Sequence, residues 1–209
     1  MRKNLGKKPL IYPQPVLMIG TYDENGNVTK NYYQKILDGG HAIGNHSAHH
    51  DYSIVYKNID SFKNEVNLLA NNIYEATGYK TTIFRYPGGS SNTVHKKYNT
   101  EIMQDSMRAL KEMGYVYFDW NIDSDDATSK WNEFSSTSSQ SRKDELVSEY
   151  VNAITKDAFK YKTVFLLCHE KAITLAALPK LVSAFKSNGY EFRVLSKYVT
   201  PCQHRKLAE

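Results

Sequence analysis

Only two cysteines, Cys168 and Cys202, occur among the 209 residues. A framework of several disulfides is therefore not expected, although two thiols leave the redox compartment of the protein open. No apolar run approaches the length of a membrane span, so we expect no transmembrane segment. The basic opening MRKNLGKK resembles the start of a secretion signal, but no apolar segment follows it.

The chain also lacks a block of Lys and Arg interleaved with aromatic residues, which a nucleic-acid groove requires. Its 27 Lys and Arg exceed its 22 Asp and Glu, and the net charge of +5 suits contact with an anionic polymer. Because the positive charges are scattered along the chain, we expect no nucleic-acid partner.

Apolar runs of strand length alternate with segments in which apolar residues repeat at helical spacing. The expected strands lie at residues 16–20, 42–43, 81–84, 115–120, 163–168 and 191–195. Amphipathic helices are expected between them, and one of these opens at Asp60 or Ser61 and ends at Gly78. The alternation predicts an α/β fold, a parallel sheet or barrel covered by helices.

With 41% hydrophobic residues, the chain is long enough for one domain with a sizeable core. We interpret residues 1–209 as a single domain. An irregular basic segment at 1–15 precedes a core at 16–195 and a tail at 196–209. The stretch 121–143 is rich in Ser, Thr and Asp, which predicts a long loop.

Polar and titratable residues follow four of the expected strands. They are His46 and His50, Arg85, the segment 119–126, and His169. Taken singly, each has a structural explanation, such as a surface charge or a satisfied histidine at a strand end. Because chemistry gathers at the carboxyl ends of parallel strands, their joint placement favours a functional site.

The histidine-rich segment GHAIGNHSAHHDY, residues 40–52, predicts a metal site. His46 and His50 lie four residues apart, with Ser47 directly after the first. On one helical turn such positions point the same way, so two imidazoles can bind one metal ion. Neutral imidazole is a preferred ligand of zinc and other divalent first-row metals. The alternative is a surface loop that happens to be rich in histidine.

Four motifs occur in order along the chain: HSAHH at 46–50, RYPGG at 85–89, DWNIDSDDA at 119–127 and FLLCH at 165–169. Together they resemble the polysaccharide deacetylases of carbohydrate esterase family four. That family carries His-Ser/Thr-x-x-His, Arg-x-Pro-x-Gly and Leu-x-Leu-x-His motifs, and Cys168 before the last histidine is a departure. The resemblance covers roughly residues 16–195. It implies a distorted (β/α) barrel, zinc as the usual metal, and removal of an N-acetyl group from a sugar amine.

The resemblance also implies the roles of the site residues. His46 and His50 would hold the metal, and His169 would be the general acid that protonates the leaving amine. A general acid needs a neighbouring carboxylate to stay protonated. Asp126 is the matching position for that carboxylate, with Asp123 as second choice.

By the same resemblance, substrate contacts fall on Trp120, Leu167 and Pro87. Trp120 and the region of Leu167 would wall the acetyl pocket. Arg85 would orient the catalytic base and is counted with His169 and Asp126 as a catalytic residue.

Family members open with a strand that ends in Thr-Phe-Asp-Asp-Gly, whose two aspartates are the base and the third metal ligand. No such motif occurs here, and the nearest sequence, TYDENG at 21–26, lies too close to His46. We interpret residues 16–20 as the family's second strand, so that the first strand and its helix are missing from a truncated or degenerate relative. The alternative is a shortened first motif in which Asp23 is a metal ligand.

The implied function is a metal-dependent deacetylase of an N-acetylglucosamine polymer, with peptidoglycan before chitin. Its cofactor would be zinc or another divalent first-row metal, and family analogy suggests an extracellular or cell-wall location. Because the aspartate pair is missing, we expect weak activity or none. The alternative is a non-catalytic remnant of the same fold that binds carbohydrate or metal.

A barrel without its first strand leaves bare parallel edges, whose backbone groups need partners. The spare apolar material is KPLIYPQP at residues 8–15, although its prolines make it a poor central strand. We expect either this segment to cover the gap or a second copy of the chain to pair there as a homo-oligomer.

Overall fold

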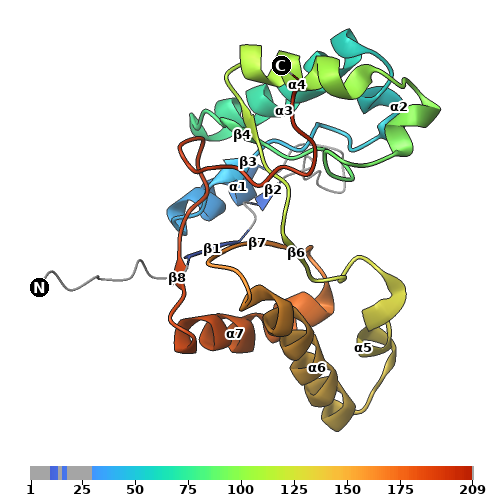
Figure 1. The fold of residues 1–209 in the computed structure, drawn as a ribbon. Helices are drawn as coiled ribbons and strands as arrows, with labels where there is room; N and C mark the ends of the chain where they lie inside the picture. Colours follow the sequence, from blue (N-terminus) through green and yellow to red (C-terminus); the bar gives the residue numbers. More distant parts are fainter. Residues whose placement is uncertain (1–9, 14–15, 18–29, 209) are drawn as a thin grey trace, which may run out of the picture. The chain divides into compact units, whose positions relative to one another are not determined.

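The computed structural model describes residues 10–13, 16–17 and 30–208. These residues form two compact units, which are coloured along the chain in Figure 1. The first unit contains residues 10–13 and 120–193, and the second contains residues 16–17, 30–119 and 194–208. Both units are α/β, and every strand pair in these ranges is parallel, as the alternating pattern predicted. The segment TYDENG at 21–26, with the alternative metal ligand Asp23, lies outside the described residues.

The first unit is built on a four-stranded sheet in the order β6-β7-β1-β8. Its strands are β1 (Leu10–Pro13), β6 (Ile122–Asp123), β7 (Thr163–Leu167) and β8 (Glu191–Phe192). The last four residues of β7 are all buried. This is the pattern of a parallel strand covered on both faces, and it explains why TVFLL reads as a continuous apolar run.

The prediction that residues 1–15 are irregular is wrong for residues 10–13, which form β1 between β7 and β8. Ile11 lies opposite Val164 and is only 1% exposed, so burial of its side chain favours the strand. Pro13 stands at the last position of β1, opposite Leu166 and beyond the two residues that pair with β8. A residue without a backbone N–H is tolerated at such a position.

The helices of the first unit cover this sheet with a shared apolar core. They are the 3₁₀ helix η2 (Ser129–Trp131), α5 (Glu133–Ser136), α6 (Gln140–Ala158) and α7 (Ala172–Ser187). The prediction of a long loop at 121–143 is therefore wrong. Trp131 and Phe134 are buried in the core and anchor this polar stretch as β6, η2, α5 and the start of α6. Two isolated aromatic residues give no periodic signal, which is why composition alone indicated a loop.

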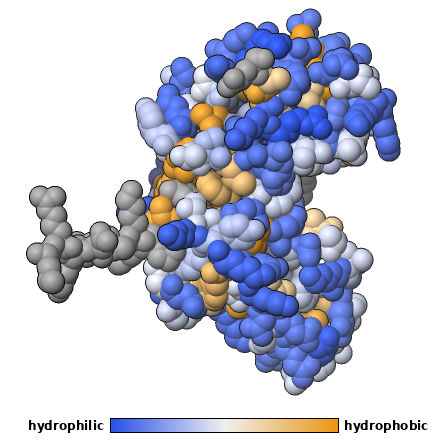
Figure 2. Space-filling model, viewed as in Figure 1, coloured by the Kyte–Doolittle hydropathy of each residue, from blue (hydrophilic) through white to orange (hydrophobic). Residues whose placement is uncertain are grey.

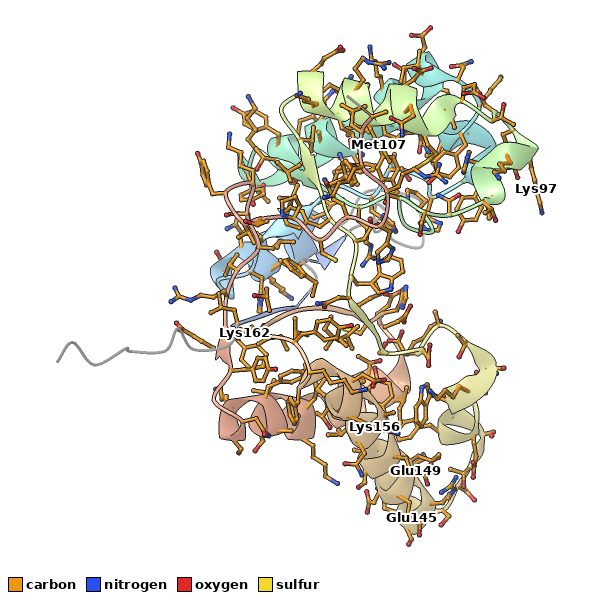
Figure 3. All side chains as sticks on the ribbon, in the orientation of Figure 1. Lys97, Met107, Glu145, Glu149, Lys156 and Lys162 are labelled. Carbon is orange, nitrogen blue, oxygen red and sulfur yellow. The ribbon has the colours of Figure 1, made fainter. Side chains whose placement is uncertain are left out.

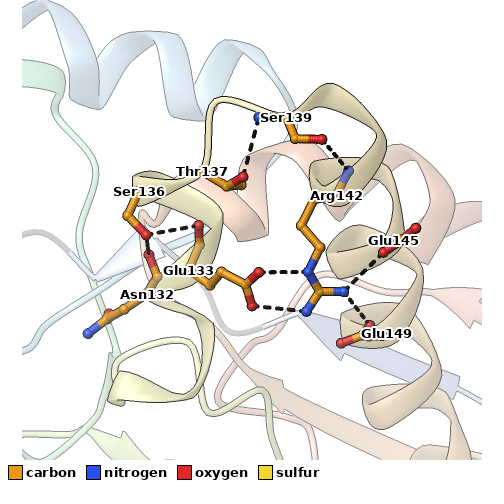
Figure 4. Close-up of polar contacts among 8 residues, drawn as sticks. All are labelled: Asn132, Glu133, Ser136, Thr137, Ser139, Arg142, Glu145 and Glu149. Atoms are coloured by element: carbon orange, nitrogen blue, oxygen red, sulfur yellow. Dashed lines mark hydrogen bonds and ion pairs between the residues drawn. The ribbon is translucent and has the colours of Figure 1, made fainter.

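An ion-pair network on the surface joins α5 to α6 (Figure 4). The guanidinium of Arg142 binds both carboxylate oxygens of Glu133, at 2.7 and 2.9 Å, across the loop between the two helices. Its Nη1 also contacts Glu145 at 3.2 Å and Glu149 at 2.9 Å along α6. The bidentate geometry fixes the direction of the short helix α5.

The second unit contains strands β2 (Val16–Leu17), β3 (Ile43–Gly44), β4 (Ile83–Phe84) and β5 (Val116–Tyr117). β2 pairs with β3, and β4 pairs with β5. A parallel bridge between Asn45 and Phe84 joins the two pairs, with the N–H of Asn45 donating to the carbonyl of Ile83 at 2.8 Å. The four strands therefore follow one another side by side in chain order.

Five helices belong to the second unit in the described ranges. They are α1 (Lys30–Asp38), α2 (Tyr52–Val55), α3 (Ile59–Thr77), the 3₁₀ helix η1 (Val94–Lys97) and α4 (Ile102–Glu112). In α3 the apolar residues at helical spacing, Phe62, Val66, Leu69 and Ile73, are fully buried, and Gly78 ends the helix with a φ of 72°. The helix begins at Ile59, one or two residues before the expected start at Asp60 or Ser61, because Asn58 caps it by accepting the N–H of Ser61 at 2.8 Å.

The predicted tail at 196–209 is also an ordered part of the second unit up to residue 208. The carbonyl of Cys202 accepts the N–H of Asp119 at 2.7 Å, and the carbonyl of Arg205 accepts the hydroxyl of Tyr117, also at 2.7 Å. The amide of Gln203 donates to the carbonyl of Tyr117 at 3.1 Å. The segment is polar in sequence, but its backbone groups form hydrogen bonds with β5 and with Asp119. Composition alone could not indicate these contacts.

Polar residues cover most of the visible surface in Figure 2, and apolar ones show as scattered orange patches. Within the described ranges, no helix has both the length and the apolar character to cross a membrane.

Candidate active site

His46 and His50 lie next to each other after the end of β3. Their ring centroids are 4.8 Å apart and the ring planes meet at 63°. His46 is buried and His50 is half-buried, so one edge of the pair reaches the surface. Two imidazoles at this separation can contact one ion.

The turn between these histidines is not the helical turn that the sequence predicted. Ser47 and His50 have φ values of 67° and 52°, in the left-handed region that non-glycine residues seldom adopt. Asn45 Oδ1 accepts the N–H of Ser47 at 3.0 Å, and Ser47 Oγ accepts the N–H of His50 at 3.1 Å. These short side chains offer the backbone an alternative to the helix. The predicted meeting of the two rings is confirmed, but its helical basis is wrong.

The protonation of His46 follows from its partner. His46 Nδ1 lies 2.7 Å from the carbonyl oxygen of Arg85. Because a carbonyl can only accept, Nδ1 carries a proton, and in the neutral ring the lone pair is then on Nε2. Metal-binding histidines are commonly oriented by a hydrogen bond of this kind, so His46 fits a metal ligand.

In the part of the chain that the structure describes, no three His, Cys, Asp or Glu side chains gather as a metal site. His46 and His50 would therefore supply two ligands of a metal site. His49 is exposed, and its Nδ1 lies 2.7 Å from Glu65 Oε1.

The RYPGG segment directly follows β4 and is fixed at both ends. The N–H of Arg85 donates to the carbonyl of Asn45 at 3.0 Å, and the Arg85 side chain is buried. Pro87 is buried too, and its carbonyl accepts the hydroxyl of Tyr56 at 2.6 Å. After the segment, the buried carboxylate of Asp119 accepts the N–H and the hydroxyl of Ser90, at 2.8 and 2.5 Å.

In the first unit, His169 and Asp126 form the contact that was predicted. Asp126 Oδ1 lies 2.7 Å from His169 Nδ1, and Oδ2 accepts the backbone N–H of His169 at 2.6 Å. The hydroxyl of Thr174, at the start of α7, donates to Oδ2 at 2.6 Å. The second choice, Asp123, is exposed and accepts the N–H of Asp125.

Burial acts to raise the pKa of Asp126, but the hydrogen bonds from His169 and Thr174 outweigh it and leave the pKa lowered. Asp126 is therefore ionised near neutral pH. An ionised carboxylate accepts the proton of His169 Nδ1, which presents Nε2 of a one-third exposed ring for chemistry.

The remaining predicted site residues of the first unit lie at strand ends. Leu167 is the buried last residue of β7, and its carbonyl accepts the N–H of Ser124 at 3.1 Å. Trp120 is half-buried before β6. The structure thus brings His46, His50 and the backbone of Arg85 together in the second unit, and Asp126 and His169 together in the first. No contact tests the substrate roles of Trp120, Leu167 and Pro87, which stay predictions.

Sequence reasoning missed a carboxylate and a hydroxyl that hold these segments, Glu65 and Thr174, and the structural role of Asp119. For Glu65 a signal exists, because a charged residue on the apolar face of α3 beside Phe62 and Val66 must have a buried partner. For Thr174 and the structural role of Asp119 the sequence gives no signal, because their partners lie far away along the chain.

The geometry agrees with comparisons to known proteins. The sequence profile described as polysaccharide deacetylase matches residues 15–117. The Bacillus subtilis (strain 168) protein YheN, whose name refers to the same family, is 29% identical over 168 residues, which is 78% of this chain. The catalytic domain of peptidoglycan N-acetylglucosamine deacetylase from Eubacterium rectale ATCC 33656 superposes with a TM-score of 0.73 at 27% identity. That match covers 86% of this chain and 76% of the other.

A CE4 esterase of Streptococcus mutans also superposes, with a TM-score of 0.63 at 25% identity over 91% of this chain and 87% of the other. The first two curated relatives are longer proteins. The chain spans about half of their length, 51% of YheN and 50% of a peptidoglycan-N-acetylglucosamine deacetylase from Bacillus cereus that is 26% identical over 73% of this chain.

Proposed function

Because the chain belongs to the polysaccharide deacetylase family, we propose that it removes N-acetyl groups from an N-acetylglucosamine polymer in a metal-dependent hydrolysis. The observation that carries the proposal is the facing pair His46 and His50, with His46 Nδ1 bound to a carbonyl. Peptidoglycan is the first candidate substrate, since relatives named for it match this chain, and chitin is the second.

Two histidines would hold the metal, zinc or another divalent first-row ion. His46 would bind it through Nε2, since its Nδ1 lies against the carbonyl of Arg85, and His50 would present the second imidazole. When bound, zinc supplies Lewis-acid polarisation of the acetyl carbonyl and activation of a water molecule. A carboxylate or water would complete the coordination, and Asp23 is the local candidate for that carboxylate.

His169 would act as the general acid. Its Nδ1–H is held by Asp126, so the proton for the leaving group sits on Nε2. The oxygen of a water molecule bonds to the acetyl carbon and the C–N bond of the acetamide breaks. The proton of Nε2 goes to the amine nitrogen, and the acyl group leaves with the water oxygen as acetate. The carboxylate of Asp126 stabilises the imidazolium before transfer and keeps the ring in place afterwards.

The other residues would shape the substrate site. Arg85 would orient the base through its buried side chain, and Trp120, Leu167 and Pro87 would contact the sugar or its acetyl group. The described residues supply no assigned base. We therefore expect slower turnover than in an intact relative, because an acid–base group contributes on the order of 10²–10⁴-fold.

Zinc titration into chelator-stripped protein by calorimetry tests the metal site. We expect binding by the parent chain and none after His46→Ala combined with His50→Ala, while His41→Ala, at an exposed position before β3, binds as the parent does. Binding that survives the double substitution contradicts the site.

Acetate release from chitooligosaccharides and from peptidoglycan fragments tests the activity. Slow release that a chelator abolishes supports a deacetylase. Release at ordinary enzyme rates would mean that an unassigned residue supplies the base. Zinc and oligosaccharide binding without any release would favour the remnant that binds but does not react.

A further inference from the structure

Glu65 is a buried carboxylate on α3 whose position core packing does not explain. It is 5% exposed and lies on the helix face that also buries Phe62 and Val66. A carboxylate is costly to bury unless it is hydrogen-bonded. Both of its oxygens accept from a single residue, Oε2 from the N–H of His49 at 3.0 Å and Oε1 from His49 Nδ1 at 2.7 Å.

His49 belongs to the turn that presents the histidine pair. Ser47 and His50 are held there in left-handed backbone conformations, which persist only when surrounding contacts impose them. Two successive residues of α3 supply contacts of this kind. The carbonyl of Val66 accepts from the amide of Asn45 at 2.8 Å at the start of the turn, and Glu65 holds His49 near its end.

A carboxylate also binds both the backbone and the ring of a histidine in the first unit. Asp126 accepts both the backbone N–H and Nδ1 of His169, at 2.6 and 2.7 Å. A carboxylate that binds the main chain and the ring of one residue fixes the loop and the side-chain rotamer together. In the first unit the residue fixed in this way, His169, is itself the proposed acid. In the second unit the fixed residue is His49, and its neighbour His50 has the proposed function.

We propose that Glu65 is a positioning residue for metal binding. It holds the turn in the conformation in which His50 faces His46, and it keeps the imidazole of His49 engaged with α3 instead of the pair. This inference rests on the proposed metal site. It assigns Glu65 no contact with the metal or the substrate.

Zinc calorimetry on chelator-stripped Glu65→Ala and Glu65→Gln tests the proposal. Loss of an orienting partner typically weakens metal affinity about 10–100-fold, and we expect this for Glu65→Ala. Glu65→Gln keeps one acceptor oxygen and should weaken binding less. Glu75→Gln, an exposed carboxylate of the same helix, is the matched control and should bind zinc as the parent does.

Val66→Ala is the control for a general loss of stability. It removes core packing from the same turn of α3 and leaves the Glu65 contacts in place. If the two substitutions lower the melting temperature equally, the zinc affinity of Glu65→Ala should still be lower than that of Val66→Ala. Equal affinity of these two variants, or parental affinity of Glu65→Ala, overturns the proposal.

Hydrogen exchange of the His49 and His50 amides in metal-free protein provides a readout independent of the metal. We expect faster exchange of both amides in Glu65→Ala and parental exchange in Glu75→Gln. If the parent binds no zinc, the metal site itself fails. If hydrogen exchange of the His49 and His50 amides is unchanged in Glu65→Ala, Glu65 does not stabilise the turn, whatever the zinc result.

Discussion

At the scale of single residues, His46 and His169 are oriented in the same way by different partners. In each, a protein oxygen lies within hydrogen-bond distance of Nδ1 of the imidazole, and the proposed chemistry falls on Nε2. The partner of His46 is the neutral carbonyl of Arg85, which suits a metal ligand. The partner of His169 is the carboxylate of Asp126, which suits a proposed acid. The charge of the partner therefore separates the two proposed roles.

Asp126→Asn should lower kcat by about 10²–10⁴-fold, because the amide cannot stabilise the protonated ring of His169. The substitution keeps the volume of the side chain, so the fold should survive. Asp123→Asn is the matched control, an exposed aspartate three residues away that should leave kcat near the parental value. Kinetics of acetate release measure both, and an unchanged kcat in Asp126→Asn contradicts the proposed acid.

The same substitution has an effect on stability that does not depend on activity. The folded-state pKa of Asp126 is lowered from 3.8, so its ionised form stabilises the fold above that pH. This stabilisation is lost as pH falls through the lowered pKa. Urea unfolding from pH 6 to pH 2 should show a smaller acid-induced loss in Asp126→Asn than in the parent chain. An identical loss in both would show that the pair adds no stability.

At the scale of secondary structure elements, short helices depend on side chains that tie them to longer ones. Four-residue α5 is too short to be stable alone, and Phe134 in the core and Glu133 on the surface hold it. The hydrogen bond from Arg142 lowers the pKa of Glu133, which outweighs the small opposing effect of burial. This ion pair therefore stabilises the fold above the ordinary glutamate pKa and less as pH falls.

Arg142→Met should lower the melting temperature by a few degrees at pH 7, because one guanidinium serves three carboxylates (Figure 4). The difference from the parent should shrink at pH 3, and also in 1 M salt, which screens exposed charges. Arg108→Met is the control, since Arg108 contacts only Asp105 among the ion pairs given for the described residues. Thermal unfolding followed by circular dichroism measures both, and a difference that persists at pH 3 would point to lost packing of the arginine stem.

At the scale of the whole molecule, the fold of each unit depends on contacts between distant parts of the chain. Figure 3 shows side chains filling the spaces between the ribbon elements of both units. In the first unit, residues from near the amino terminus lie between strands that begin at Thr163 and Glu191. In the second unit, residues 202–205 bind β5 and Asp119.

Ile11→Ala should lower the free energy of unfolding by about 2–5 kcal/mol, the usual cost of truncating a buried isoleucine. Deletion of residues 1–13 should be more severe, because it removes a central strand and leaves backbone groups of β7 and β8 unpaired. Light scattering with size exclusion should then show aggregates or a dimer. Deletion of residues 1–8 is the control that retains β1. A stable monomer after deletion of residues 1–13 would show that β7 and β8 need no strand between them.

Much of the candidate site could be predicted from local sequence because its motifs are short. His46 and His50 lie within one turn of chain, and Asp126 follows Trp120 in a single motif, so their roles could be assigned by resemblance. Glu65, sixteen residues from its partner His49, could not be assigned in this way. A hydrogen bond between distant residues leaves no periodic pattern in either segment.

The sequence by itself determined the alternation of strands and helices, the buried faces of α3 and α4, and the four motifs. These follow from hydrophobic periodicity and local turn chemistry, which act over a few residues. Only the tertiary structure decided that Leu10–Pro13 becomes a central strand, that residues 202–208 pack on the second unit, and that the histidine turn is left-handed. The physical reason is that each feature depends on partners from remote segments. The strand at residues 10–13 pairs with β7 and β8, residues 202–208 bind backbone groups of β5, and the histidine turn contacts the carboxylate of Glu65.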